Sequence, residues 1–302
     1  MYVVDMHCDS LLEVSASRGL RTAYNFSNDH HHIQFVAEWV ACKGESAAAR
    51  RRRLVHMLDI FIAERARLGL VPIMSCHDLN FAIECEQDGA ILSIEGGGGL
   101  FADSEELDML YRAGLRVLGI CWDTNELATS SFDAVDNGLT PAGRELITKA
   151  SEMGIILDIS HMSDRSTAEL LELTPYPVIA SHSNFREICS HPRNLPRELA
   201  EKVVRRGGII GLNLCPPFVT DDGKPKIEDM LRHVDFGLEH YGERALGFGF
   251  DIDGTDGEYP LGITEKRSIH DQFLEFLDKH YSSSTIELLA GKNVIDFLKN
   301  NL

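Results

Sequence analysis

Residues of the types that bind metal ions stand at the ends of apolar runs in this sequence. The first run, Val3 to Met6, is followed by His7 and Asp9. Residues two apart on a strand point to the same face, so these two side chains would project together. A neutral imidazole beside a carboxylate suits Zn²⁺ or a related divalent cation. His7 and Asp9 therefore predict part of a metal site, and its other ligands must come from elsewhere in the chain.

The candidate partners lie at equivalent places along the chain, because each ends or follows an apolar run. They are Glu95, His161, His182 and Asp251. Taken singly, each has an ordinary interpretation: a His after a strand is often a hydrogen-bonded loop residue, and Asp251 could cap a turn with Asp253 and Gly254. Taken together, six such groups at five strand ends favour a metal-dependent active site.

The number of candidate ligands exceeds the needs of one tetrahedral Zn²⁺ ion. Two metal ions that share a bridging carboxylate would use all of them. Paired metals about 4 Å apart acidify a bridging water and polarise the bond under attack, which is a common hydrolytic arrangement.

The strands that would carry these residues alternate with helical segments. We expect eight main strands, from residues 3–8 and 33–41 at the start to 246–250 at the end, nearly all separated by helices. This alternation predicts a parallel sheet. Eight such units in 302 residues predict one α/β domain, residues 1–302, folded as a (β/α)8 TIM barrel with C-terminal helices. The carboxyl ends of barrel strands meet on one face, which would bring the candidate ligands together.

Four other features have simpler interpretations. The run His30 to His32 is expected to be an exposed loop, since nothing fixes three consecutive side chains on one metal. The four arginines at positions 50–53 are expected to form a solvated helix face. The four glycines at 96–99 would let backbone approach whatever Glu95 holds. Cys8 should point into the barrel wall as a core residue and not as a ligand.

The composition limits the possible partners. The 29 Lys and Arg residues against 47 Asp and Glu give a net charge of −18, which argues against nucleic acid and anionic membranes. The sequence shows neither a secretory signal nor an apolar run of transmembrane length, so we expect a cytoplasmic protein that does not bind membranes. The 7 cysteines are odd in number and include no C-x-x-C pair, which favours reduced thiols.

Six short blocks are His7-x-Asp9, Glu95-Gly96-Gly97, Asp158-Ile159-Ser160-His161, Ser181-His182-Ser183-Asn184, His191-Pro192-Arg193-Asn194-Leu195-Pro196 and Gly249-Phe250-Asp251-Ile252-Asp253-Gly254. In order and spacing they resemble the membrane (renal) dipeptidase family of zinc metallopeptidases, peptidase family M19. The resemblance runs over most of the chain, and the stretch 181–196 is its most specific part. It implies a short bacterial-type member with a TIM barrel of the metal-dependent hydrolase type.

By motif match, the resemblance implies a site for two Zn²⁺ ions or another divalent metal. His7 and Asp9 would bind one ion, Glu95 would bridge both, and His161 and His182 would complete the second. A bridging hydroxide would attack the scissile carbonyl. Asp251 would orient that water, take its proton and pass it to the leaving amine.

The resemblance also assigns substrate contacts, with two departures from the family pattern. Arg193 would hold the C-terminal carboxylate of the substrate. Trp122 stands where mammalian members carry a substrate-binding His, although short bacterial members share the Trp. Cys215, in Asn213-Leu214-Cys215, replaces an aromatic hydroxyl. Both departures concern the substrate pocket and leave the expected metal ligands intact.

The expected function is therefore that of a zinc-dependent dipeptidase acting on small dipeptides. The resemblance alone adds tolerance of a D-residue at the C-terminal side and a homodimer. Trp122 and Cys215 motivate an alternative, a related metal-dependent amidohydrolase acting on another small amide or N-acyl amino acid. A catalytically silent barrel serving as a scaffold is a third hypothesis; loss of a metal ligand would have supported it, and none is lost.

Overall fold

The computed structural model of the protein describes residues 1–11, 29–40, 44–98 and 104–302. The described strands form one parallel sheet in the order β2-β1-β9-β8-β7-β6-β5-β4-β3, and an additional pairing of β2 with β4 closes it. The strands are β1 (Tyr2–Asp5), β2 (His31–Trp39), β3 (Val71–Pro72), β4 (Gly89–Glu95), β5 (Leu115–Gly119), β6 (Ile156–Asp158), β7 (Ile179–Ala180), β8 (Ile209–Leu212) and β9 (Leu246–Phe248). Only the short β3 lies outside the ring, beside the start of β4. The predicted eight-stranded parallel TIM barrel is thus confirmed.

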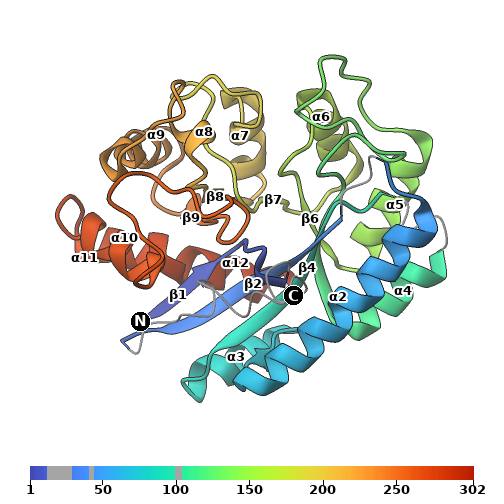
Figure 1. Cartoon of the computed structure of the whole chain (residues 1–302), viewed down its shortest axis with the longest axis horizontal. Helices are drawn as coiled ribbons and strands as arrows, with labels where there is room; N and C mark the ends of the chain where they lie inside the picture. Colours follow the sequence, from blue (N-terminus) through green and yellow to red (C-terminus); the bar gives the residue numbers. More distant parts are fainter. Residues whose placement is uncertain (12–28, 41–43, 99–103) are drawn as a thin grey trace.

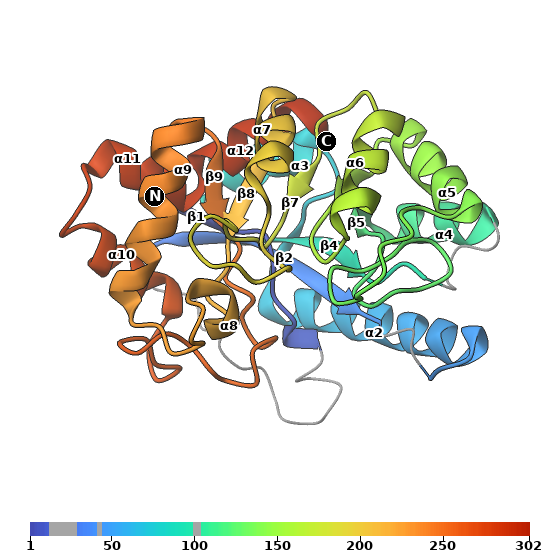
Figure 2. The ribbon, with the colours of Figure 1, turned by 90° about the horizontal axis from the view of Figure 1, so that it is seen from above.

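The helices surround this ring. They are α2 (Ala47–Leu68), α3 (Cys76–Glu84), α4 (Ser104–Ala113), α5 (Pro141–Glu152), α6 (Asp164–Leu173), α7 (Arg197–Arg205), α8 (Pro216–Val219), α9 (Met230–Tyr241), α10 (Ile269–Leu277), α11 (Ser283–Glu287) and α12 (Asn293–Asn301), with a 3-10 turn at Ile227–Asp229 and a π-helical turn at Leu288–Lys292. Figure 1 shows α2, α4, α5 and α6 on one side of the strands and α7, α9 and α10 on the other. Figure 2 gives the view from above.

Alternate residues along each strand face two separate cores, as the period of two requires. Val4 and Phe35 belong to the cluster inside the barrel, whereas Val3 and Val36 pack in the outer layer between strands and helices. Val294 of α12 joins the inner cluster, and Leu79 of α3 does so too. These two helices close the end of the barrel where the strands begin. The opposite end, where the strands finish, is left for polar residues.

The histidine run differs from the prediction of an exposed loop. His31 and His32 begin β2 and pair with Tyr2 and Val3 of β1. His32 is only 1% exposed, and its backbone N–H donates to Asp88 Oδ1 over 2.6 Å. Strand pairing therefore decides the placement of this segment, whatever its polar composition.

The arginine run is only in part the solvated face that its composition predicts. Arg51 and Arg52 are exposed, but Arg50 is buried to 7% exposure and pairs with Glu126 through Nη2 and Oε1, 3.1 Å apart. Residue 126 lies in the long segment after β5, so this partner could not be foreseen from the run itself.

Two smaller expectations are also tested by the fold. Cys8 is fully buried in the outer core, as predicted, and every described cysteine is a free thiol; Cys42 lies outside the described residues. Among the described helices, none combines the length and apolar character needed to cross a bilayer.

Candidate metal centre

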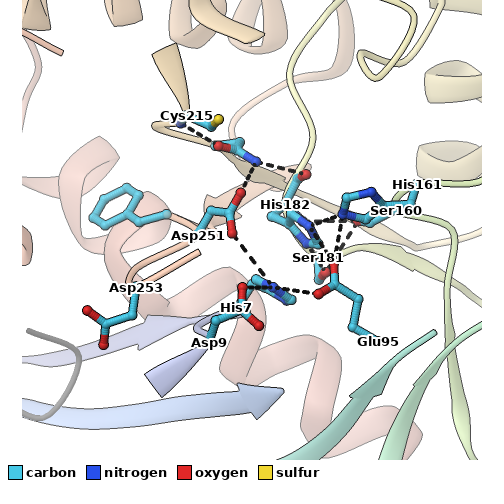
Figure 3. Close-up of polar contacts among 12 residues, drawn as sticks. His7, Asp9, Glu95, Ser160, His161, Ser181, His182, Cys215, Asp251 and Asp253 are labelled. Atoms are coloured by element: carbon cyan, nitrogen blue, oxygen red, sulfur yellow. Dashed lines mark hydrogen bonds and ion pairs between the residues drawn. The ribbon is translucent and has the colours of Figure 1, made fainter. Parts of the chain in front are cut away.

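The candidate ligands from the sequence meet at one end of the barrel. His7 and Asp9 follow β1, Glu95 is the last residue of β4, and His161 follows β6. His182 and Asp251 stand two and three residues after β7 and β9. Figure 3 shows the six side chains pointing toward one another from these separate strands. All six are buried, so the fold collects groups from positions 7 to 251 of the sequence into one water-poor cluster.

Glu95 lies at the middle of this cluster, and its two carboxylate oxygens face different partners. Oε1 is 2.7 Å from His161 Nε2 and 3.3 Å from His182 Nε2. Oε2 faces the other way and lies 3.7 Å from His7 Nε2. A carboxylate placed in this manner can serve two sets of ligands at once.

His7 lies between the remaining carboxylates. Its Nε2 is 3.5 Å from Asp9 Oδ2 and 3.8 Å from Asp251 Oδ1 (Figure 3). The imidazole ring stacks on that of His182, with the ring centroids 3.7 Å apart. None of these contacts satisfies Nε2 of His7, which is buried without a hydrogen-bond partner.

Burial and charge shift the pKa values of these groups in opposite directions. Burial raises the pKa of Glu95 well above its usual range, although His7 opposes this, and burial likewise raises the pKa of Asp251. Burial lowers the pKa of His161 and His182 well below the usual value, so both imidazoles are neutral. For His7, burial is outweighed by Glu95 and Asp9, which raise its pKa to about 10. The carboxylates that raise the pKa of His7 would also favour a bound cation, beside the neutral imidazoles of His161 and His182.

The donor set fits divalent metal ions. Ligand atoms of Glu95, His161 and His182 lie within 4.8 Å of one another, and the same is true of His7, Asp9 and Glu95. The two groups share Glu95. Buried polar atoms without partners, Nε2 of His7 and Oδ1 of Asp9, lie in the second group. Imidazole nitrogens and carboxylate oxygens are the ligands that Zn²⁺ prefers when sulfur is absent.

Unusual backbone conformations hold two of the side chains in place. His161 and Asp251 have φ angles of 69° and 62°, in the left-handed region that residues other than glycine seldom adopt. Such conformations persist only where the surrounding structure enforces them, and they are common at functional sites.

The glycines near the cluster differ in what they accommodate. A Cβ on Gly96 would lie 2.2 Å from the carbonyl oxygen of Val40, so this glycine lets a neighbouring backbone segment approach. Gly254 is the residue that faces the cluster. A Cβ there would lie 2.3 Å from both Asp9 Oδ2 and Asp251 Oδ1.

The two predicted substrate contacts lie beside the cluster. Arg193 is 3% exposed, and it donates from Nη1 to Ser183 Oγ and from Nη2 to the His182 carbonyl, both over 2.8 Å. Trp122 lines a pocket of about 1050 Å³, and its ring centroid lies 6.1 Å from that of His161. Phe132 lines the same pocket, 5.7 Å from the His161 ring.

Several residues that support the cluster were not assigned a role from sequence. Asn213 donates to Asp251 Oδ2 over 3.1 Å. Asp5 accepts from the backbone N–H groups of His7 and Phe250 and from His270 Nε2, so it ties the ends of β1 and β9 to α10. The signal that could have found them is the same as for the ligands, namely a polar residue in or just after an apolar strand.

The family model described as membrane dipeptidase (peptidase family M19) matches residues 1–301. The dipeptidase tcpJ of Claviceps purpurea is 26% identical over 278 residues, which are 88% of this chain and 65% of that relative, so the chain spans just under two thirds of its length.

Solved structures share the fold. A metallo peptidase from Rhodobacter sphaeroides, solved with a phosphinate mimic of L-Ala-D-Ala, superposes with a TM-score of 0.90 at 21% identity over 100% of this chain and 99% of its own. The dipeptidase AC, a family M19 metallo peptidase, gives 0.87 at 22% identity over 100% and 98%. At these identities the likeness establishes the barrel alone. The family model, which spans nearly the whole chain, shows that the chain belongs to the membrane dipeptidase family, peptidase family M19.

Proposed function

We propose that this protein is a metal-dependent dipeptidase that hydrolyses small dipeptides with two Zn²⁺ ions. The observation that carries the proposal is the pair of ligand groups that share Glu95. His7 and Asp9 would hold one ion, His161 and His182 the other, and Glu95 would contact both. Bound divalent metals supply Lewis acidity that polarises a scissile carbonyl and lowers the pKa of an attacking water.

Asp251 is the residue best placed to move the proton. Its side chain is 10% exposed, and Asn213 holds Oδ2, which leaves Oδ1 turned toward His7. A general base must lie beside the water it deprotonates, and a raised pKa makes the carboxylate a stronger base toward that water. Asp251 Oδ1 would accept the proton from the attacking water and deliver it to the leaving amine.

Arg193 would bind the C-terminal carboxylate of the dipeptide. Its hydrogen bonds go to neutral oxygens, and Nε is buried without a partner. Within the described parts of the chain, no carboxylate forms an ion pair with this guanidinium. The carboxylates of Asp251, Glu95 and Asp158 act on this charge from beyond ion-pair distance. An anionic group of the substrate would contact the guanidinium directly and would be bound strongly there.

Trp122 and Phe132 would form one wall of the space beside His161. The adjoining pocket of about 1050 Å³ leaves room for a substrate side chain. That the Rhodobacter sphaeroides metallo peptidase was solved with a mimic of L-Ala-D-Ala supports testing dipeptides with a C-terminal D-residue.

A related amidohydrolase activity on N-acyl amino acids is the second candidate. The observation behind it is Cys215, which is half-buried near Asp251 and carries no hydroxyl to contact a peptide. Such a substrate would still offer its carboxylate to Arg193 and its amide to the metal ions.

One panel tests both candidates. L,L- and L,D-dipeptides are compared with matched N-acetyl amino acids, in the presence of Zn²⁺ and after treatment with a chelator. We expect turnover of dipeptides that the chelator abolishes and Zn²⁺ restores. Turnover of the acetylated compounds alone would favour the second candidate, and activity that resists the chelator would refute the role of the metal.

A further inference from the structure

Asp158, Ser181 and His182 form a buried chain of hydrogen bonds behind the metal centre. Asp158 ends β6, and Ser181 and His182 follow β7, the strand beside it. Ser181 Oγ donates to Asp158 Oδ2. The same oxygen lies 2.7 Å from His182 Nδ1 (Figure 3). The exposed fractions of the three residues are 6%, 1% and 0%, so water does not compete for these bonds.

The direction of each bond follows from what each group can donate. Asp158 Oδ1 already accepts the backbone N–H groups of Ser160 and Ser181, both at 2.9 Å. A carboxylate only accepts, and a serine hydroxyl has a single proton. Because that proton goes to Asp158, Ser181 Oγ can only accept from His182, so His182 carries its proton on Nδ1. Its Nε2 then carries a lone pair, on the side that faces Glu95 Oε1 at 3.3 Å and His161 Nε2 at 2.9 Å.

We propose that Asp158 and Ser181 are positioning residues that fix His182 in the Nδ1–H tautomer and thereby present Nε2 to a metal ion. This inference rests on the proposed metal centre. Residues that orient a histidine ligand through its second nitrogen commonly contribute 10- to 100-fold to metal affinity. His161 lacks this arrangement, because its Nδ1 is buried without a hydrogen-bond partner.

We call the hydrogen-bond chain from Asp158 through Ser181 to His182 the relay. The substitution Asp158→Asn tests it, because Asn keeps the shape of the side chain and reverses the bond to Ser181. The Asn oxygen can still accept the two backbone N–H groups, which places its NH₂ group against Ser181 Oγ. Ser181 Oγ can then donate to His182 Nδ1 at 2.7 Å, which is nearer than its other neighbour, Ser160 Oγ at 3.3 Å. The imidazole proton moves to Nε2, where it blocks metal binding. A reversed tautomer of this kind disables other histidine-dependent sites even when their geometry is preserved.

The experiment measures Zn²⁺ affinity by competition with a chromophoric chelator for wild type, Asp158→Asn, Ser181→Ala and the double variant. We expect Asp158→Asn to weaken binding by about 10- to 100-fold, and by more than Ser181→Ala. The double variant should bind as Ser181→Ala does, since no hydroxyl remains to transmit the reversal. Equal loss in Asp158→Asn and the double variant, or no loss in Asp158→Asn, would overturn the relay.

Two additions separate the relay from folding and from the proposed function. Asp78→Asn is the matched control, because Asp78 Oδ2 also accepts a serine hydroxyl (Ser75) and a backbone N–H (Met74) but lies in α3 at the closed end of the barrel. It should bind Zn²⁺ as wild type does. Imidazole ¹⁵N NMR of the metal-free proteins should show Nδ1–H for His182 in wild type and Nε2–H in Asp158→Asn. This arm decides the relay even if wild type binds no Zn²⁺, an outcome that would refute only the proposed metal centre.

Discussion

Asn213 donates its side-chain N–H to Oδ2 of Asp251 over 3.1 Å, and this bond joins the ends of β8 and β9. Asn213 is itself fixed, because its Oδ1 accepts the backbone N–H of Cys215 over 2.6 Å. Only one oxygen of Asp251 therefore remains to face the cluster. A carboxylate with one oxygen held and one directed at the reaction centre suits a group that takes and returns a proton.

Replacing Asp251 by Asn should abolish proton transfer and leave the backbone conformation unchanged. Asn tolerates the left-handed φ of 62° at this position much as Asp does. We expect kcat for a dipeptide to fall by about 10²- to 10⁴-fold, with bound zinc retained by elemental analysis. Asp256→Asn is the control, since Asp256 is exposed and has a φ of 54°. An Asp251→Asn enzyme with wild-type kcat would exclude the assigned role.

Replacing Arg193 by Ala should affect only substrates with a free carboxylate. Truncating one member of a buried ion pair typically costs about 2 to 5 kcal/mol. We expect KM for a dipeptide to rise by at least about tenfold, which is 1.4 kcal/mol, and KM for the corresponding dipeptide amide to change little. Steady-state kinetics on both substrates, with the more exposed Arg197→Ala as control, provide the check. Equal effects on the two substrates would reject the assignment.

Adding a methyl group at Gly254 should disturb two carboxylates at once. The new Cβ would lie 2.3 Å from Asp9 Oδ2 and Asp251 Oδ1, so at least one side chain must move. We expect Gly254→Ala to lower kcat/KM by more than about tenfold, because small misplacements of catalytic groups are costly. Gly223→Ala, at a glycine with a φ of 65° and open space around it, should lower the melting temperature without changing kcat/KM. A fall in kcat/KM for Gly223→Ala but not for Gly254→Ala would contradict the close approach of residue 254 to Asp9 and Asp251.

The stability of the protein should depend on pH through His233, away from the metal centre. The ring is buried, Nδ1 accepts from the Phe185 N–H, and Nε2 lies 3.0 Å from the Val219 carbonyl. This arrangement requires neutral imidazole, and burial lowers the pKa to about 4. The unfolded chain binds a proton near pH 6.5, so the stabilisation is complete above that pH and is lost as the pH falls toward 4.

The lowering of the pKa of His233 from 6.5 to about 4 corresponds to a loss of roughly 3 kcal/mol in the free energy of unfolding between pH 6.5 and pH 4. His233→Gln cannot titrate, so its free energy of unfolding should fall less than that of wild type over this interval. Urea unfolding at several pH values, with a chelator present to exclude metal release, measures the difference. His56→Gln, at an exposed position of α2, should keep the wild-type slope. Identical slopes for His233→Gln and wild type would contradict the assignment.

The sequence by itself determined the barrel and the types of residue at the ends of its strands. Strand periodicity and strand–helix alternation are local patterns, and in a parallel barrel they dictate which ends converge. For this reason His7, Glu95 and His182 could be expected to meet although they lie far apart in the amino-acid sequence. The same local patterns placed Cys8 in the core, as found.

Only the tertiary structure decided the partners, because a side chain's neighbours depend on where distant segments pack. His32 is buried by pairing with β1, and Arg50 by Glu126, in spite of compositions that predict exposure. The direction of the hydrogen bond from His182 to Ser181 depends on Asp158, on the adjacent strand. No local pattern encodes the bond from Ser181 to Asp158, since it forms only once β6 and β7 have paired and excluded water from between them.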